Sequence, residues 1–341
     1  MVRAHAGGHI TLVFTIEKAQ KLYRDQGSRG FGFSISHGVS IDAAYQNLNA
    51  NIDADAYNVG TTPDQDIETI NGTVTFEVRD MNGQLLDDHT MYELYIEACK
   101  DARLIKPYDE FSFNIQIECP RSQGFGMSSA GLIALGKAIQ TCTGRGSSRQ
   151  FMRIAHRIER IVSGGLGDVL GASVGGVELR LQPGAPDWPG HAVSFDIDEE
   201  ILIVWEEDET RHTSNYIDDE NWMNSITEAG EIALKYFTED EWGEHQWSAI
   251  LRESADFGKN SGLEEESSRK KVLDIVRRCV AEESLESIVE PRLCMLGTSV
   301  AVLPVKLDDK DSSWQTTLLN AARDQGLCVM VTRIHNLDSS I

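Results

Sequence analysis

Positive charge is scarce in this chain. It holds 31 lysine and arginine residues against 54 aspartate and glutamate residues, which gives a formal net charge of −23. Such a surface repels phosphate backbones, so the composition disfavours nucleic-acid binding. An anionic small substrate stays compatible with it, provided that a few cations and helix N-termini converge on one site. The acidic excess fits adaptation to a salty cytoplasm and an ordinary acidic protein equally well.

Long apolar runs and paired cysteines are also missing. The run Ile10–Ile16 is far too short to cross a bilayer, and the first residues show no A-x-A cleavage pattern. We therefore expect neither a signal peptide nor a membrane segment, and a cytoplasmic location. The six cysteines include no C-x-x-C pair, which disfavours a zinc site and leaves reduced core thiols as the expectation.

Length and composition favour a globular protein with two lobes. The chain has 341 residues, of which 41% are apolar and 25% charged. The strongest break in composition is 182–190, which holds three prolines and two glycines. We place the lobe boundary there, and predict an N-terminal domain over 1–182 and a C-terminal domain over 191–341. Strands that alternate with helices predict an α+β fold.

Periodicity locates the elements. Apolar residues at helical spacing predict helices over Ser128–Gln140 and Arg149–Val162, and the polar segment 255–270 is a candidate mobile loop. The other predicted helices are Met91–Ala102, 219–236, 240–256, 267–282 and 312–325. The predicted strands are Ile10–Ile16, 27–39, Gly72–Val78, Phe111–Ile117, Gly175–Leu181, Ile201–Trp205, Leu293–Val305 and Leu327–Thr332.

The main candidate for chemistry is the segment 120–131, which reads Pro-Arg-Ser-Gln-Gly-Phe-Gly-Met-Ser-Ser-Ala-Gly. It follows a predicted strand and opens a predicted helix. Its small residues would let the backbone approach an anion that the first N–H groups of the helix attract. Ser128 and Ser129 could cap the helix, bind a phosphate oxygen or bind Mg²⁺. A plain serine-capped helix after a glycine turn is the alternative.

Two nucleotide-binding motifs are nearly matched and fail. Gly131–Ala138 approaches the P-loop pattern, but the final Ser or Thr is missing and the run lies within a predicted helix. The segment 124–129 lacks the third glycine of the Rossmann fingerprint.

Two carboxylates follow, at Glu159 and Asp168. Glu159 lies beside the apolar stripe of the second helix, and Asp168 comes after the glycine-rich turn 163–167. Together they could hold Mg²⁺ and accept a hydroxyl proton. Alternatively, Glu159 pairs with an arginine of its own helix and Asp168 caps the next helix.

Three further turns carry polar groups. Ala6–Thr11 and Gly27–Gly30 place His9 and Arg29 beside glycines, where they could bind a carboxylate. Gly297–Ser299 leads into an apolar strand and could reach the phosphate loop. Ordinary turn chemistry is the alternative for all three.

Taken together and in this order, these segments resemble the GHMP kinases, the superfamily of galacto-, homoserine, mevalonate and phosphomevalonate kinases. The family motif P-x-x-x-G-L-G-S-S-A corresponds to 120–130 here. The segments 8–11, 27–30, 165–168 and 183–186 look more specifically like the archaeal pantoate kinases. Two departures stand out: Gly7 replaces the proline that opens the first family motif, and the third motif keeps only Gly297.

The resemblance implies a fold and a set of functional residues. The N-terminal lobe would resemble the second domain of a ribosomal small-subunit protein, the C-terminal lobe would be ferredoxin-like, and ATP and substrate would bind between them. Ser128 or Ser129 would hold Mg²⁺ with Glu159, and Asp168 would be the catalytic carboxylate. The residues that would cradle the ATP phosphates are Gly124, Phe125, Gly126, Met127, Ser128, Ser129 and Ala130.

The implied activity is ATP-dependent phosphorylation of a primary hydroxyl of pantoate, giving 4-phosphopantoate for coenzyme A synthesis. Arg29 is expected to meet the substrate carboxylate, with His9, Ser28 and His37 nearby. The alternatives are another GHMP kinase acting on homoserine, shikimate or a mevalonate intermediate, and a non-catalytic ATP or metabolite sensor on the same fold. A decarboxylase of related fold is a more distant one. A homodimer is the default assembly.

Overall fold

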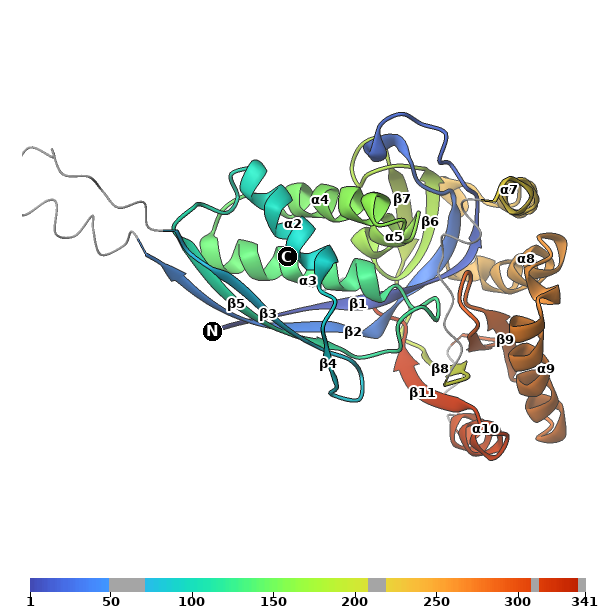
Figure 1. Ribbon diagram of the computed structural model, residues 1–341. Helices are drawn as coiled ribbons and strands as arrows, with labels where there is room; N and C mark the ends of the chain where they lie inside the picture. The colour runs from blue at the N-terminus through green and yellow to red at the C-terminus, as the bar shows by residue number, and fades with distance from the viewer. Residues whose placement is uncertain (49–70, 208–218, 308–312, 337–341) are drawn as a thin grey trace, which may run out of the picture.

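The chain forms two lobes, each built on its own sheet (Figure 1). The computed structural model describes residues 1–48, 71–207, 219–307 and 313–336. Over these residues the N-terminal sheet has seven strands in the order β4-β3-β5-β2-β6-β7, with β1 paired to β2 off that path. These strands are β1 (Val2–Phe14), β2 (Gly30–Asn47), β3 (Val74–Arg79), β4 (Leu85–Leu86), β5 (Asp109–Ile117), β6 (Val177–Gln182) and β7 (His191–Phe195).

The long antiparallel pair of β1 and β2 is the centre of this lobe. Most side chains of β1 from Gly8 onward are buried, because the strand is covered on both faces. The register between the two strands shifts between Gly7 and Gly8, where Ser36 and His37 of β2 are left unpaired. This irregularity on the neighbouring strand lies beside His9.

Four helices lie together against the N-terminal sheet (Figure 1). They are α2 (Thr90–Asp101), α3 (Met127–Thr143), α4 (Ser148–Ile161) and α5 (Asp168–Val174). The last residues of the predicted helices Ser128–Gln140 and Arg149–Val162 lie within three residues of the ends of α3 and α4, and their first residues within one. α4 begins where a reciprocal capping box joins Ser147 and Gln150, and α3 contains the whole P-loop look-alike 131–138.

The C-terminal lobe has an antiparallel sheet in the order β11-β8-β10-β9. Its strands are β8 (Glu200–Trp205), β9 (Val289–Leu293), β10 (Val300–Pro304) and β11 (Cys328–Arg333). Its α-helices are α7 (Glu220–Leu234), α8 (Trp247–Asn260), α9 (Ser267–Glu282) and α10 (Ser313–Asp324). None of the helices in the described ranges is long and apolar enough to cross a membrane.

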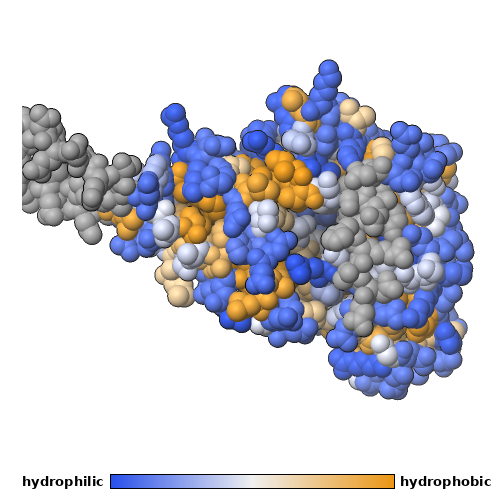
Figure 2. Space-filling view, in the orientation of Figure 1, coloured by the Kyte–Doolittle hydropathy of each residue, from blue (hydrophilic) through white to orange (hydrophobic). Residues whose placement is uncertain are grey.

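The lobes are joined by direct packing. The backbone N–H of His335, just after β11, donates to Ser34 O on β2 at 2.8 Å. The rings of Phe14 and Phe257 meet edge to face with centroids 5.5 Å apart. On the face drawn in Figure 2, apolar patches gather on the N-terminal lobe, and much of the C-terminal lobe is hydrophilic.

Three sequence-based expectations need correction. The segment 182–190 does not separate the lobes, because β7 follows it and pairs with β6 in the same sheet, so the change of sheet falls between β7 and β8. The segment 255–270 is largely helical, since α8 continues to Asn260 and α9 starts at Ser267, with Leu263 buried between them. The strand predicted over 293–305 is shorter: Leu293 ends β9, 294–299 form a turn, and β10 covers Val300–Pro304.

Candidate active site

A cavity of about 570 Å³ opens where the two lobes meet, within the range usual for small-molecule sites. It is lined by the loop before α3, the turn before α5, the start of α2 and two residues of the C-terminal lobe, Met295 and Leu296. Of the residues predicted from sequence, Ser28, 124–128 and Asp168 line this cavity. The structure therefore brings the predicted phosphate loop and the predicted catalytic carboxylate to one place.

The loop before α3 is shaped by two glycines in the left-handed region. Gly124 has φ +81° and Gly126 has φ +66°, and Gly126 is the N-cap of α3. The first turn of α3 holds no acidic residue, so nothing there competes with an anion for the free N–H groups. The two serines differ in role: Ser129 Oγ donates to Gly126 O at 2.7 Å, whereas Ser128 lines the cavity.

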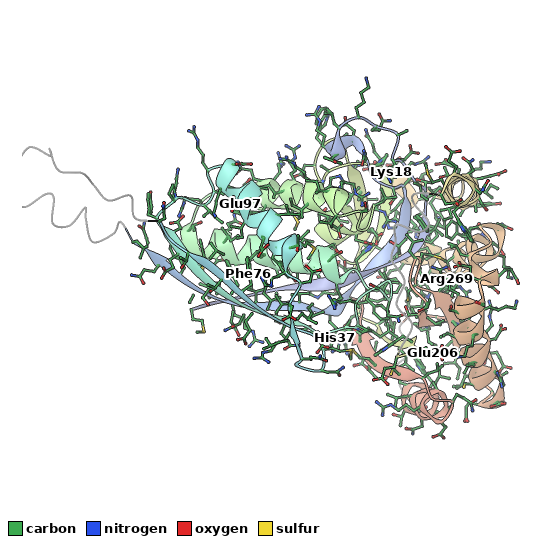
Figure 3. The ribbon with its side chains drawn as sticks, viewed as in Figure 1. Lys18, His37, Phe76, Glu97, Glu206 and Arg269 are labelled. Carbon is green, nitrogen blue, oxygen red and sulfur yellow. The ribbon has the colours of Figure 1, made fainter. Side chains whose placement is uncertain are left out.

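The C-terminal lobe supports this loop from behind. A Cβ at Gly297 would lie 2.0 Å from Gln123 O, so only glycine fits there. Thr298 Oγ1 donates to Gln123 Oε1 at 2.8 Å, and the Ser299 hydroxyl donates to Gln123 O. The buried Arg269, labelled on α9 in Figure 3, donates from Nε to Gly297 O at 2.7 Å. The predicted third motif is thus a brace for the phosphate loop, while the cavity lining comes from its neighbours Met295 and Leu296.

Glu159 lies on α4 with its carboxylate buried beside the cavity. Ser128 Oγ donates to Glu159 Oε1 at 2.7 Å. Burial and the nearby charge of Asp168 raise the pKa of Glu159 to about 8, against the opposing effects of the Ser128 hydrogen bond and the charges of Arg160 and His9. A buried carboxylate with so little compensation, next to a hydroxyl, has the oxygen donors that a divalent cation prefers.

Arg160, the neighbour of Glu159 on α4, shapes the turn before Asp168. Its Nη2 donates to the carbonyl oxygens of Gly164 and Gly165, the latter at 2.6 Å. The side chain is almost fully buried. The sequence suggested an arginine partner for Glu159 itself, and the structure instead assigns this arginine to the turn backbone.

Asp168 is the first residue of α5, and its side chain is 20% exposed at the cavity. Its Oδ1 accepts from His9 Nδ1 at 2.9 Å and from Thr11 Oγ1 at 3.5 Å. Burial alone would raise the pKa of Asp168, but the His9 hydrogen bond and charge, with the charges of Arg180 and Arg160, hold it below its usual value. Asp168 is therefore an ionised carboxylate that faces the cavity.

His9 is completely buried between two carboxylates. Its Nε2 lies 3.0 Å from Glu178 Oε1 on β6, and Glu178 is in turn paired with Arg180 two residues along the same strand. Burial lowers the pKa of His9, but the charge of Glu178 and hydrogen bonds to both carboxylates outweigh it and raise the pKa to about 9. Sequence reasoning missed Glu178 and Arg180, although two opposite charges between apolar residues of one strand are a signal of a buried pair.

The residues predicted for the substrate are not all at the cavity. Ser28 lines it, but among the lining residues that the structure describes neither Arg29 nor His37 appears. Arg29 Nη1 donates to both carboxylate oxygens of Glu231 on α7, each at 2.8 Å. His37 Nδ1 lies 2.9 Å from Thr332 Oγ1 of β11, where the two lobes meet (Figure 3).

The fold and this site together define a class. A glycine loop that begins a helix, a buried carboxylate beside its serine and a second carboxylate gather at one interlobe cavity. They lie on a two-lobed fold similar to that of solved homoserine and mevalonate kinases. Residues 90–176 match the family model described as the GHMP kinases N terminal domain. The resemblance seen in the motifs is thereby confirmed.

The chain is also similar to individual kinases and to solved structures. The chain is 24% identical over 307 residues to the pantoate kinase of Methanocaldococcus jannaschii, covering 88% of this chain and 92% of the relative. It is 35% identical over 85 residues to the pantoate kinase of Thermococcus kodakarensis, covering 25% and 28%. A solved structure described as a phosphotransferase related to the coenzyme A biosynthesis pathway has TM-score 0.70 at 20% identity, covering 98% of this chain and 96% of that one. A homoserine kinase from Cytophaga hutchinsonii has TM-score 0.63 at 12% identity, covering 98% and 95%.

Proposed function

We propose that this protein is an ATP-dependent kinase that phosphorylates the primary hydroxyl of pantoate to 4-phosphopantoate. The observation that carries the proposal is the placement of the α3 loop and the ionised Asp168 on one cavity. The choice of pantoate as acceptor rests on the two archaeal relatives described above, and the coenzyme A pathway on the related phosphotransferase.

The phosphate groups of ATP fit the loop before α3. Its glycines leave the backbone open, and the unpaired first N–H groups of α3 would attract the negative charge of a triphosphate. Phosphoryl transfer passes through a loose transition state, so alignment and charge neutralisation contribute more than covalent help. We assign Gly124 through Ala130 to this role, with the Ser129 hydroxyl bonded to the Gly126 carbonyl within the helix and Ser128 at the cavity.

Glu159 and Ser128 are the residues that would hold Mg²⁺. They offer a carboxylate and a hydroxyl oxygen, which suits a cation that takes few protein ligands and fills its sphere with phosphate oxygens and water. When bound, the ion neutralises charge on the transferring phosphoryl group.

Asp168 acts at the acceptor. As the acceptor oxygen attacks the γ-phosphorus and the bond to ADP breaks, the hydroxyl proton passes to this carboxylate. Its low pKa makes it a weak base, but in a loose transition state the proton leaves late and orientation matters more than basicity. Ser28 lies in the same cavity and is our candidate for a substrate contact.

The direct test measures ADP release with Mg-ATP and pantoate, homoserine, shikimate or mevalonate offered separately. We expect turnover with pantoate and a loss in kcat of about 10²–10⁴-fold in Asp168→Asn, with ATP affinity preserved. Turnover with a different acceptor would support the kinase activity and show that pantoate is not the substrate. ATP binding without turnover on any acceptor would favour a sensor instead.

A cytoplasmic location and a homodimer complete the proposal. The first is supported by the lack of a long apolar segment in the sequence, and the second only by how common two-fold pairs are. Light scattering on the purified protein tests the dimer.

A further inference from the structure

Four charges of alternating sign, three of them fully buried, run from the cavity into the N-terminal sheet. They are Asp168 on α5, His9 on β1, and Glu178 and Arg180 on β6. Asp168 Oδ1 and His9 Nδ1 are 2.9 Å apart, and His9 Nε2 and Glu178 Oε1 are 3.0 Å apart. The last three side chains have no exposed surface. A buried row of this kind persists only when each charge is paired, because an uncompensated one is costly.

His9 also touches the phosphate loop through its backbone. Its N–H donates to Phe125 O at 3.0 Å, and a Cβ at Gly126 would lie 2.9 Å from His9 N. One residue therefore contacts the loop on one side and the proposed base on the other. His9 therefore sets the distance between the phosphate loop and Asp168.

The packing around the imidazole of His9 restricts the ring to one position. A Cβ at Gly171, in the first turn of α5, would lie 2.4 Å from His9 Nε2, so α5 can press against the ring only because 171 is glycine. His9 and Thr11 both contact Oδ1 of Asp168, and Oδ2 lies against Gly165, where a Cβ would be 1.8 Å from it. The contacts of the ring and of Thr11 thus fix the orientation of the carboxylate.

The charged groups around His9 favour an imidazolium. Asp168 faces it from α5 and Glu178 from β6, with Arg180 beyond Glu178, and Glu159 on α4 also acts on its neighbourhood. The two direct neighbours are both negative, and the nearer positive group is already paired with Glu178. A doubly protonated ring would donate from Nδ1 to Asp168, and its Nε2, which has no hydrogen-bond partner in the described part of the chain, would face Glu178 as a close ion pair.

We propose that His9 is a positioning residue for phosphoryl transfer, which acts as a buried imidazolium anchored on Glu178 to fix Asp168 at a set distance from the phosphate loop. The inference rests on the proposed kinase function. His9 is predicted above as a substrate contact, and in this assignment it reaches the substrate only through Asp168.

The test is a double-mutant cycle on purified, folded protein. His9→Asn keeps a hydrogen-bond donor near the Nδ1 position but has no charge and no contact with Glu178. His9→Leu removes the donor as well. We expect kcat to fall about tenfold or more in His9→Asn and further in His9→Leu, with KM for ATP and for the acceptor within about twofold of wild type. In the Asp168→Asn background, adding His9→Asn should lower kcat by less than about twofold, because the effect of His9 passes through Asp168.

His5→Asn is the matched control. His5 lies on the same strand and contacts a carboxylate, Glu118 Oε2, at 3.4 Å, and it is not among the described residues that line the cavity. Its kcat should stay at the wild-type value. Additive losses of His9→Asn and Asp168→Asn, or a fall in substrate affinity without a fall in kcat, would overturn the proposal.

A second measurement needs no turnover. Nitrogen-15 NMR of the nine histidines should show one ring protonated on both nitrogens at pH 8, and that signal should disappear in Glu178→Gln. Wild type that phosphorylates none of the acceptors would defeat the proposed function while this signal still tests the His9 arrangement. A neutral His9 at pH 8 in active protein would defeat the inference alone.

Discussion

At the scale of single residues, one buried histidine ties stability to pH. Folding raises the pKa of His9 from its ordinary value of 6.5 to about 9, so the folded state favours the charged form. A group whose pKa is raised on folding contributes its stabilisation fully below the unfolded value. The contribution disappears as the pH rises through the folded value. At about 1.4 kcal/mol per pH unit, the difference is on the order of 3 kcal/mol.

The free energy of unfolding should therefore fall as the pH rises from about 6.5 to 9, which urea titrations at pH 6.5, 7.5 and 9 measure. Glu159, with its pKa raised to about 8, contributes a fall in the same direction at lower pH. The comparison of variants isolates His9: His9→Asn should flatten the slope between pH 7.5 and 9, and His5→Asn should keep it. Equal slopes in wild type and His9→Asn would contradict a charged His9.

At the scale of elements, local signals predicted the helices well and the buried charges poorly. The apolar stripe of α4, with Phe151, Ala155 and Ile158, and its serine cap are all within one segment, so the local sequence is sufficient to predict the helix. The pairing of His9 with Glu178 depends instead on the order of β1, β2 and β6, which no local pattern reveals. The predicted strand 293–305 began too early because it included Cys294 to Ser299, which form the turn that supports the phosphate loop, and it left out all of β9 except Leu293.

Two helical glycines with different surroundings provide a test at this scale. Gly171→Ala should lower the free energy of unfolding by about 1–3 kcal/mol, because its Cβ would overlap the His9 ring, and should reduce kcat as α5 shifts Asp168. Gly258→Ala on α8 has room, with the nearest atom 3.6 Å away, and should stabilise by about 0.4–1 kcal/mol with kcat unchanged. Denaturant unfolding and ADP release give both readouts. A tolerated Gly171→Ala with normal kcat would show that the ring is free to move.

At the scale of the whole molecule, the lobes hold each other across the active cavity. The Gly297 turn braces the phosphate loop from the C-terminal side, and Arg29 beside Ser28 reaches across to Glu231 of α7. Only Nη1 of Arg29 is used in that ion pair, and its Nε is buried without a hydrogen-bond partner. Arg29 does not line the cavity, although its neighbour Ser28 does. To reach the carboxylate of a substrate next to Ser28, the guanidinium would have to leave Glu231, so the two carboxylates would compete for it.

This competition gives opposite predictions for the two partners of the ion pair. Arg29→Ala should raise KM for pantoate about tenfold or more, because the substrate carboxylate loses a charged donor. Glu231→Gln should lower KM, since Arg29 is then released to the substrate, and kcat should change little in either variant. Steady-state kinetics with pantoate varied at saturating ATP decide the matter. If Arg29→Ala leaves KM unchanged, Arg29 is only a link between the lobes, and the carboxylate of the substrate is held by another group near Ser28.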